Sequence, residues 1–264
     1  SALFLSLIIN DIRGEVILPS FTFVASANAV TTAGATPIFA DVDKNTYNIS
    51  PDSIIESIRT AKKHNIKLKG IITVGLFGQP CDMDTITNIA KEHKLWILDD
   101  AAQSFGALYN GKVSGSLGDI SATSFFPAKP LGCYGDGGAI FTNNQELYNI
   151  MESIRIHGQG IDKYDCDRIG LNGRLDTIQA TVLLSKLNIY EEEIKLRQEV
   201  AQSYSNRLKN YIDIPLIPDN CTSVWAQYSI LLENNSSRLK VVNALKDKAI
   251  PSMIYYKKPL QLQK

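Results

Sequence analysis

The chain has 264 residues, 44% of them hydrophobic, and its 27 lysines and arginines balance its 27 aspartates and glutamates. A net charge of zero leaves no basic field for nucleic acid or an anionic membrane, so neither is expected as a partner. The four cysteines stand far apart without a C-x-x-C pair, and the longest apolar runs are strand-sized. This pattern argues against a metal site, disulfides and a membrane span, and it favours a cytoplasmic protein.

Strand and helix patterns alternate through the first part of the chain. Short apolar runs predict strands at residues 15–18, 37–41, 70–74, 95–98, 120–126 and 138–142. The first helix is expected over residues 23–33, where Gly34 ends it. A second helix starts after Ser50, and a third starts after Asp82 and runs to His93. Strand–helix units of this length require crossovers, so they predict an α/β fold with a mostly parallel sheet sandwiched by helices.

One long helix pattern, rich in leucine, glutamate and lysine, runs nearly unbroken from Asp176 to about Tyr211. We expect it to lead from a large domain, residues 1–190, into an incomplete smaller α+β domain, residues 191–264. The latter includes a predicted helix at residues 237–247. Because no methionine opens the chain and its last residues break off within a motif, we expect a fragment cut at both ends.

Lys129 lies between Ser124-Phe-Phe-Pro, the end of a predicted strand, and a glycine-rich stretch. Shielding from water disfavours an ammonium ion, and a neutral amine can form a Schiff base with an aldehyde. Asp100 follows the strand at residues 95–98, and carboxyl ends of parallel strands meet at one edge of a sheet. Such a lysine and carboxylate indicate a pyridoxal phosphate enzyme. The alternatives are a solvated lysine and a structural carboxylate, for which Asp99 is the better candidate.

Other residues could complete this site. Phe23 could cover the cofactor ring, Gln103 could bind its phenolic oxygen, and Ser124 could donate to its phosphate. A core phenylalanine, a turn-forming amide and an ordinary strand serine are the alternatives. His157 is either a lining residue or a structural loop histidine. The glycines of residues 132–138 do not open a helix, so they are no dinucleotide-binding fingerprint.

Residues 99–107, 124–138 and 170–180 carry a family resemblance. Their order and spacing resemble the DegT/DnrJ/EryC1/StrS sugar aminotransferases along essentially the whole chain. Residues 129–138 and 187–194 are most similar to the branch that acts on UDP-2-acetamido-2-deoxy-ribo-hex-3-uluronate. The resemblance implies a type I pyridoxal phosphate-dependent transferase fold and a homodimer.

The resemblance also implies roles for the candidate residues. Lys129 would carry the cofactor, Asp100 would face its ring nitrogen, and Gln103 would lie at its phenolic oxygen. Ser124 would bind the phosphate, and Phe23 would stack on the ring.

Further residues receive their roles from the resemblance alone. Asn172 would reach the cofactor phosphate of a second copy, and Arg174 would lie near that copy's substrate. Tyr256 and His157 are expected at the substrate as well. Three features depart from the family. Its Gly-Thr phosphate loop would precede the first residue, Tyr255-Tyr256 stands where the family usually has His-Tyr, and the chain stops at residues 261–264, before the rest of the small domain.

The implied activity is a ping-pong transamination. L-Glutamate would leave as 2-oxoglutarate, its nitrogen kept as pyridoxamine 5'-phosphate, and a nucleotide-linked keto sugar for cell-surface polysaccharide such as O-antigen would receive the amine. The alternatives are another nucleotide-linked 3- or 4-keto sugar, a non-catalytic partner protein of the same fold, a pyridoxamine-dependent sugar dehydratase and a nicotinamide oxidoreductase. Lys129 argues against the dehydratases, which carry histidine there, and the missing fingerprint argues against the oxidoreductase.

Overall fold

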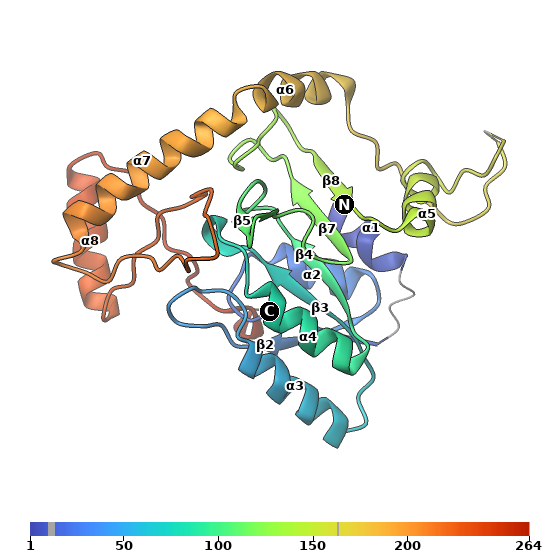
Figure 1. The fold of residues 1–264 in the computed structure, drawn as a ribbon, viewed down its shortest axis with the longest axis horizontal. Helices are drawn as coiled ribbons and strands as arrows, with labels where there is room; N and C mark the ends of the chain where they lie inside the picture. Colours follow the sequence, from blue (N-terminus) through green and yellow to red (C-terminus); the bar gives the residue numbers. More distant parts are fainter. Residues whose placement is uncertain (10–13, 163, 264) are drawn as a thin grey trace.

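A computed structural model describes residues 1–9, 14–162 and 164–263. Its centre is a six-stranded sheet in the order β2-β1-β3-β4-β7-β8 (Figure 1). The strands are β1 (Glu15–Pro19), β2 (Thr36–Ala40), β3 (Leu68–Val74), β4 (Trp96–Asp100), β7 (Ile120–Ser124) and β8 (Gly138–Phe141). Neighbouring strands are parallel except for β7 and β8, which are antiparallel. This arrangement confirms the predicted α/β class and the mostly parallel sheet.

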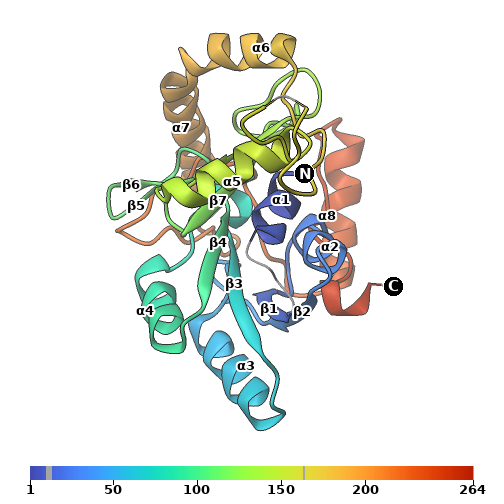
Figure 2. The ribbon, with the colours of Figure 1, turned by 90° about the vertical axis from the view of Figure 1, so that its right-hand side faces the viewer.

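Helices lie on both faces of the sheet. The helices of the described residues are α1 (Ala2–Ile8), α2 (Ala25–Thr32), α3 (Pro51–Lys63), α4 (Met83–His93), α5 (Gln145–Arg155), α6 (Thr177–Leu187), α7 (Tyr190–Leu208) and α8 (Asn235–Asp247), of which α6, α7 and α8 lie away from the sheet (Figure 1). α1 and α2 lie on one face, and α3 and α4 lie on the other (Figure 2). Val16 and Leu18 of β1 pack in the cluster with α1 and α2, whereas Ile17 packs with α3 and α4. Because alternate side chains are buried on opposite faces, the strand reads as a continuous apolar run.

The starts of α3 and α4 follow local sequence signals. The Ser50 hydroxyl accepts a hydrogen bond from the amide of Ser53, and the Asp82 carboxylate accepts one from the amide of Thr85. Each side chain satisfies an amide that has no partner within its helix. Both predicted N-caps are confirmed.

The prediction of one long, nearly unbroken helix from Asp176 to about Tyr211 is wrong. The segment forms two helices, α6 and α7, which are separated by Asn188 and Ile189 and run in different directions (Figures 1 and 2). The break lets Leu183 of α6 and Tyr190 of α7 enter one buried cluster against the body of the molecule. Packing with distant residues therefore overrides a sequence pattern that favours one continuous helix.

The chain after α7 returns to the body before it forms α8. The amide of Val224 donates to the carbonyl of Gly78 at 2.9 Å, and the amide of Thr222 donates to the carbonyl of Leu108 at 2.8 Å. Leu108 belongs to the small hairpin of β5 (Leu108–Tyr109) and β6 (Lys112–Val113). α8 confirms the helix predicted at residues 237–247, while the predicted division into two domains stays a prediction.

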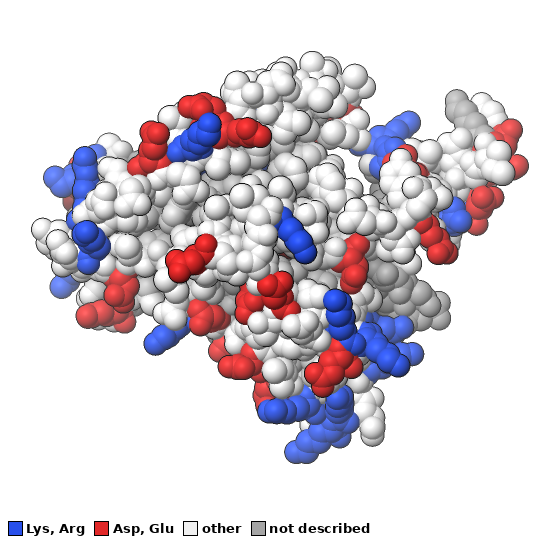
Figure 3. Space-filling model, in the orientation of Figure 1, with Lys and Arg blue, Asp and Glu red and all other residues white. Residues whose placement is uncertain are grey.

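Lysine, arginine, aspartate and glutamate are interspersed over the face shown in Figure 3. In the described part of the chain, no group of histidine, cysteine and acidic side chains could hold a metal ion. None of the described helices is both long and apolar enough to cross a membrane.

Candidate active site

Two neighbouring parallel strands end in polar residues at one edge of the sheet. β4 ends in Asp99 and Asp100, and β7 ends in Ser124. Successive side chains of a strand point to opposite faces, so the two carboxylates have different surroundings. Asp99 accepts hydrogen bonds from the Thr73 hydroxyl at 3.2 Å and from the Gly115 amide at 3.3 Å. Both contacts tie Asp99 to the protein body, which agrees with the structural role expected for it.

Asp100 receives a donor on each of its oxygens. The Ser26 hydroxyl donates to Oδ2 at 2.8 Å, and the Ala102 amide donates to Oδ1 at 3.1 Å. Asp100 is only 5% exposed. Burial raises the pKa of its carboxyl group, and this effect outweighs the Ser26 and Ala102 hydrogen bonds and the Lys129 charge, which lower the pKa.

Lys129 interacts electrostatically with this carboxylate from the loop after β7. The loop is fixed, because the Lys129 amide donates to the carbonyl of Phe126 at 2.8 Å and the buried Pro130 follows. Burial lowers the pKa of the Lys129 amine, and the charge of Asp100 opposes this effect only in part. The structure therefore brings together the two residues on which the sequence interpretation depends.

Gln103 connects this region to a group of aromatic rings. Its Oε1 accepts a hydrogen bond from the Phe77 amide at 2.9 Å, and its side chain hydrogen-bonds the Tyr256 hydroxyl. Tyr256 packs edge-on against Phe21, with ring centroids 5.4 Å apart. Burial raises the pKa of Tyr256 to about 12, so its hydroxyl stays protonated in neutral solution. Tyr256 thus reaches the buried Gln103, while Phe21 is a neighbour that sequence reasoning did not find.

Phe23 and Ser124 lie at the same edge of the sheet, and each can make further contacts. Phe23 follows β1 and is 54% exposed, which leaves much of its ring uncovered. The Ser124 hydroxyl oxygen accepts a hydrogen bond from the Phe126 amide at 3.3 Å, so its own proton remains to be donated. The roles predicted for these two side chains, toward a ring and a phosphate, stay predictions.

Asn172, Arg174 and His157 lie in the segment between α5 and α6, which extends to the right in Figure 1. All three are exposed, and the Arg174 Nε donates to Asn172 Oδ1 at 3.0 Å. Within the described residues, no hydrogen bond or ion pair joins these three side chains to Asp100 or Lys129. Their predicted roles in a second copy and at the substrate therefore stay predictions.

Ser26 is a residue of this site that sequence reasoning missed. It is 1% exposed in α2, and its partner Asp100 lies 74 residues further along the chain. A serine near a helix start has many local explanations, so the residue type gave no signal. Its position just beyond the carboxyl end of β1 was the available signal, because ligand sites form at that edge of a parallel sheet.

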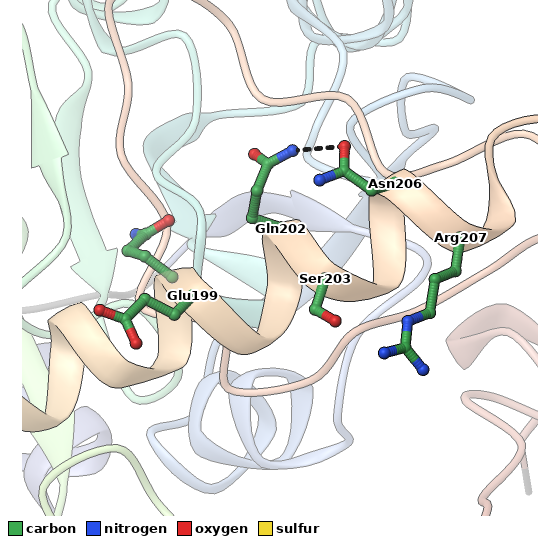
Figure 4. A pocket seen from close by; sticks show the side chains of 6 residues that line it. Glu199, Gln202, Ser203, Asn206 and Arg207 are labelled. Atoms are coloured by element: carbon green, nitrogen blue, oxygen red, sulfur yellow. Dashed lines mark hydrogen bonds between the residues drawn. The ribbon is translucent and has the colours of Figure 1, made fainter.

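A surface depression of about 640 Å³ along α7 is separate from this site. Its lining consists of polar side chains from one helix: Gln198, Glu199, Gln202, Ser203, Asn206 and Arg207. Figure 4 shows Gln202 and Asn206 joined by a hydrogen bond of 3.0 Å. No residue predicted for the active site lines this depression.

The family model of the DegT/DnrJ/EryC1/StrS aminotransferases matches residues 1–264. The chain belongs to this family. A UDP-2-acetamido-2-deoxy-3-oxo-D-glucuronate aminotransferase from Pseudomonas aeruginosa is 47% identical to it over 250 residues, which cover 94% of this chain and 67% of that protein. The chain spans about two thirds of the length of the curated relatives it matches.

Solved structures of other members have the same fold. A DegT DnrJ EryC1 StrS aminotransferase from Brucella abortus, 45% identical, superimposes with a TM-score of 0.96 over 100% of this chain and 70% of that one. NtdA from Bacillus subtilis with bound cofactor PMP, 29% identical, gives a TM-score of 0.87 over 100% of this chain and 60% of that one. The predicted family and the predicted type I pyridoxal phosphate-dependent transferase fold are confirmed.

Proposed function

We propose that the protein is a pyridoxal phosphate-dependent aminotransferase. It transfers an amino group from L-glutamate to a nucleotide-linked keto sugar, of which UDP-2-acetamido-2-deoxy-ribo-hex-3-uluronate is the first candidate. The name and 47% identity of the Pseudomonas aeruginosa relative support this substrate. The product would enter cell-surface polysaccharide synthesis in the cytoplasm.

The observation that carries the proposal is the buried Asp100 at the end of β4, whose carboxylate interacts electrostatically with the amine of Lys129. An anionic carboxylate fits a protonated pyridine nitrogen, and an amine of lowered pKa fits attachment to an aldehyde. The donor set therefore fits the cofactor. When bound, the cofactor supplies an electron sink that stabilises negative charge on the carbon next to the transferred nitrogen.

The side chains of this chain perform the remaining tasks. Asp100 holds the ring nitrogen in its protonated form, and the Lys129 Nζ, once released, moves a proton to or from the substrate carbon as general acid and base. Its lowered pKa keeps a larger fraction of this amine in the form that accepts protons. Gln103 binds the phenolic oxygen, Ser124 binds the phosphate, and Phe23 covers the ring face.

In this proposal, the residues away from Lys129 bind the cofactor phosphate or the substrate. In a homodimer, Asn172 contributes to the phosphate site of the second copy and Arg174 contributes to its substrate site. Exposure of both side chains is compatible with such a contact across copies. Tyr256 and His157 complete the proposed substrate site.

Replacing Lys129 tests the function directly. Lys129→Ala is expected to abolish glutamate-dependent transamination and the absorbance of the lysine-bound cofactor, whereas the exposed Lys112→Ala should change neither. Borohydride reduction followed by peptide mapping should place the label on Lys129. Turnover by Lys129→Ala, or a label on another lysine, would refute the assignment.

The sugar is identified by a panel of substrates. Mass spectrometry should detect an amino sugar from the UDP-linked 3-keto uronate and glutamate. A product only from another nucleotide-linked 3- or 4-keto sugar would keep the reaction class and change the substrate. No product from any of them, with no spectral response to glutamate, would favour the non-catalytic alternative.

A further inference from the structure

We infer that Ser26 is a positioning residue, which holds the Asp100 carboxylate ionised and oriented for the cofactor ring nitrogen. This inference rests on the proposed function and adds a residue to which neither the sequence pattern nor the family resemblance gave a role. Its physical basis is the 2.8 Å hydrogen bond from the Ser26 hydroxyl to Asp100 Oδ2 between two buried side chains.

The contact fixes the direction of the carboxylate. The Ala102 amide holds Oδ1, but it follows Asp100 by two residues and belongs to the same turn. Ser26 holds Oδ2 from another element, α2, which packs on the sheet through Ala27, Ala29 and Val30. With one donor on each oxygen, rotation of the carboxyl group about its terminal bond would break both hydrogen bonds. α2 therefore supplies a rigid second support.

The contact also favours the charged form of Asp100. Burial raises the pKa of this carboxyl group, and the Ser26 hydrogen bond is the foremost of the effects that oppose it, ahead of Ala102 and Lys129. Two other titratable groups face the same carboxylate. The charge of Asp100 contributes to the raised pKa of Asp99 and to that of Tyr256, whose phenol therefore stays neutral. The charge of Lys129 lowers the pKa of Asp100, while burial lowers the pKa of Lys129 itself.

The Ser26 hydrogen bond also affects the proton that the cofactor ring nitrogen and the Asp100 carboxylate share. A ring nitrogen and a carboxylate compete for one proton, and a more basic carboxylate takes more of it. Ser26 lowers the basicity of Asp100, so it keeps the proton on the nitrogen, where the proposed chemistry needs it. Loss of the hydroxyl should therefore weaken both cofactor binding and the reaction, without removing any group that touches the cofactor.

Ser26→Ala tests the inference in the full chain. Hydrogen bonds to charged groups are strong enough that we expect the apparent pKa of Asp100 in the cofactor-free protein to rise by about one pH unit. Carboxyl ¹³C NMR measures it, with the Asp100 signal identified by its loss in Asp100→Asn. The dissociation constant for pyridoxal phosphate should rise on the order of tenfold. Ser26→Thr, which keeps a hydroxyl, should restore both values toward those of the unchanged protein.

A matched control removes a hydroxyl from the same helix. Thr31 is exposed in α2 and donates to the carbonyl of Ala27, so Thr31→Ala should leave both measurements unchanged. An unchanged Asp100 pKa or an unchanged dissociation constant in Ser26→Ala would overturn the inference, while the Lys129 label would still support the proposed function. Failure of the unchanged protein to bind pyridoxal phosphate would refute both.

Discussion

At the scale of single residues, two consecutive carboxylates in β4 have different surroundings. Asp99 is 3% exposed and is tied to Thr73 and Gly115, while Asp100 is tied to Ser26 and lies near Lys129. Burial raises the pKa of Asp99 to about 6, and the neighbouring Asp100 charge adds to this effect. A buried anion without a cation beside it lowers the stability of the folded state at neutral pH.

The raised pKa of Asp99 predicts a specific dependence of stability on pH. The folded protein binds a proton at Asp99 up to about pH 6, whereas the unfolded chain releases it near pH 3.8. The contribution of Asp99 to stability is therefore fully present below pH 3.8 and is lost as the pH rises through about 6. Over this window the loss amounts to about 3 kcal/mol. Chemical denaturation at a series of pH values measures it.

Asp99→Asn isolates this contribution. An asparagine can still accept from the Gly115 amide and can donate to the Thr73 hydroxyl oxygen, so it resembles the protonated acid. Its free energy of unfolding should rise relative to the unchanged protein between about pH 4 and about pH 7. Asp219→Asn, at an exposed carboxylate, should show no such difference. Parallel curves for Asp99→Asn and the unchanged protein would contradict the prediction.

At the scale of elements, the break between α6 and α7 connects two parts of the structure. Tyr190, the first residue of α7, donates its hydroxyl to the carbonyl of Phe105 at 2.5 Å and stacks on the Phe105 ring. α6 in turn holds the loop after Lys129, because Lys186 donates to the carbonyl of Gly132 at 2.6 Å. α7 therefore holds the loop that follows β4, and α6 holds the loop that follows β7.

Tyr190→Phe should weaken the attachment of α7 to the loop that follows β4. The ring stays buried, but the Phe105 carbonyl loses its donor, so the free energy of unfolding should fall by about 1 kcal/mol. Thermal and chemical denaturation measure the change. Tyr211→Phe removes a hydroxyl from a ring that is 82% exposed and should have no effect. Equal stability of the two variants would show that the hydrogen bond contributes nothing.

Elements whose signals are local were predictable from the sequence. Ser50 and Asp82 cap their helices because each needs only an amide three residues ahead. Asn188 and Ile189 carry no comparable signal, since neither glycine nor proline marks the break. The reason for the break is Tyr190, whose partner lies 85 residues earlier.

The same distinction applies to the candidate site. That Asp100 and Lys129 lie near each other was predictable, because the ends of parallel strands meet at one edge of the sheet. Ser26 and Phe21 were not, because their contacts depend on how α2 and the end of the chain pack. The candidate residues could be proposed from the sequence, whereas the side chains that hold them in place required the packed structure.

At the scale of the whole molecule, one segment joins the end of the chain to the sheet. Residues 220–228 lie against the hairpin of β5 and β6 and against the turn at Gly78. Gly78 has a φ of +113°, and a Cβ there would lie 2.6 Å from the Trp225 nitrogen and 2.8 Å from the Ala226 nitrogen. No side chain fits into this contact. The aromatic rings beside Gln103 depend on the same turn, because Phe77 precedes Gly78.

Gly78→Ala should therefore detach this segment from the sheet. The new methyl group must displace the backbone at Trp225, so we expect the free energy of unfolding to fall by more than about 3 kcal/mol. Hydrogen exchange should accelerate at the Val224 amide, which donates to Gly78.

Gly34→Ala is the matched control: its φ is also positive, at +81°, but nothing lies within 4 Å of the added carbon. It should cost only about 1 kcal/mol. Equal costs for the two variants would mean that backbone conformation, and not this close contact, determines the effect at Gly78.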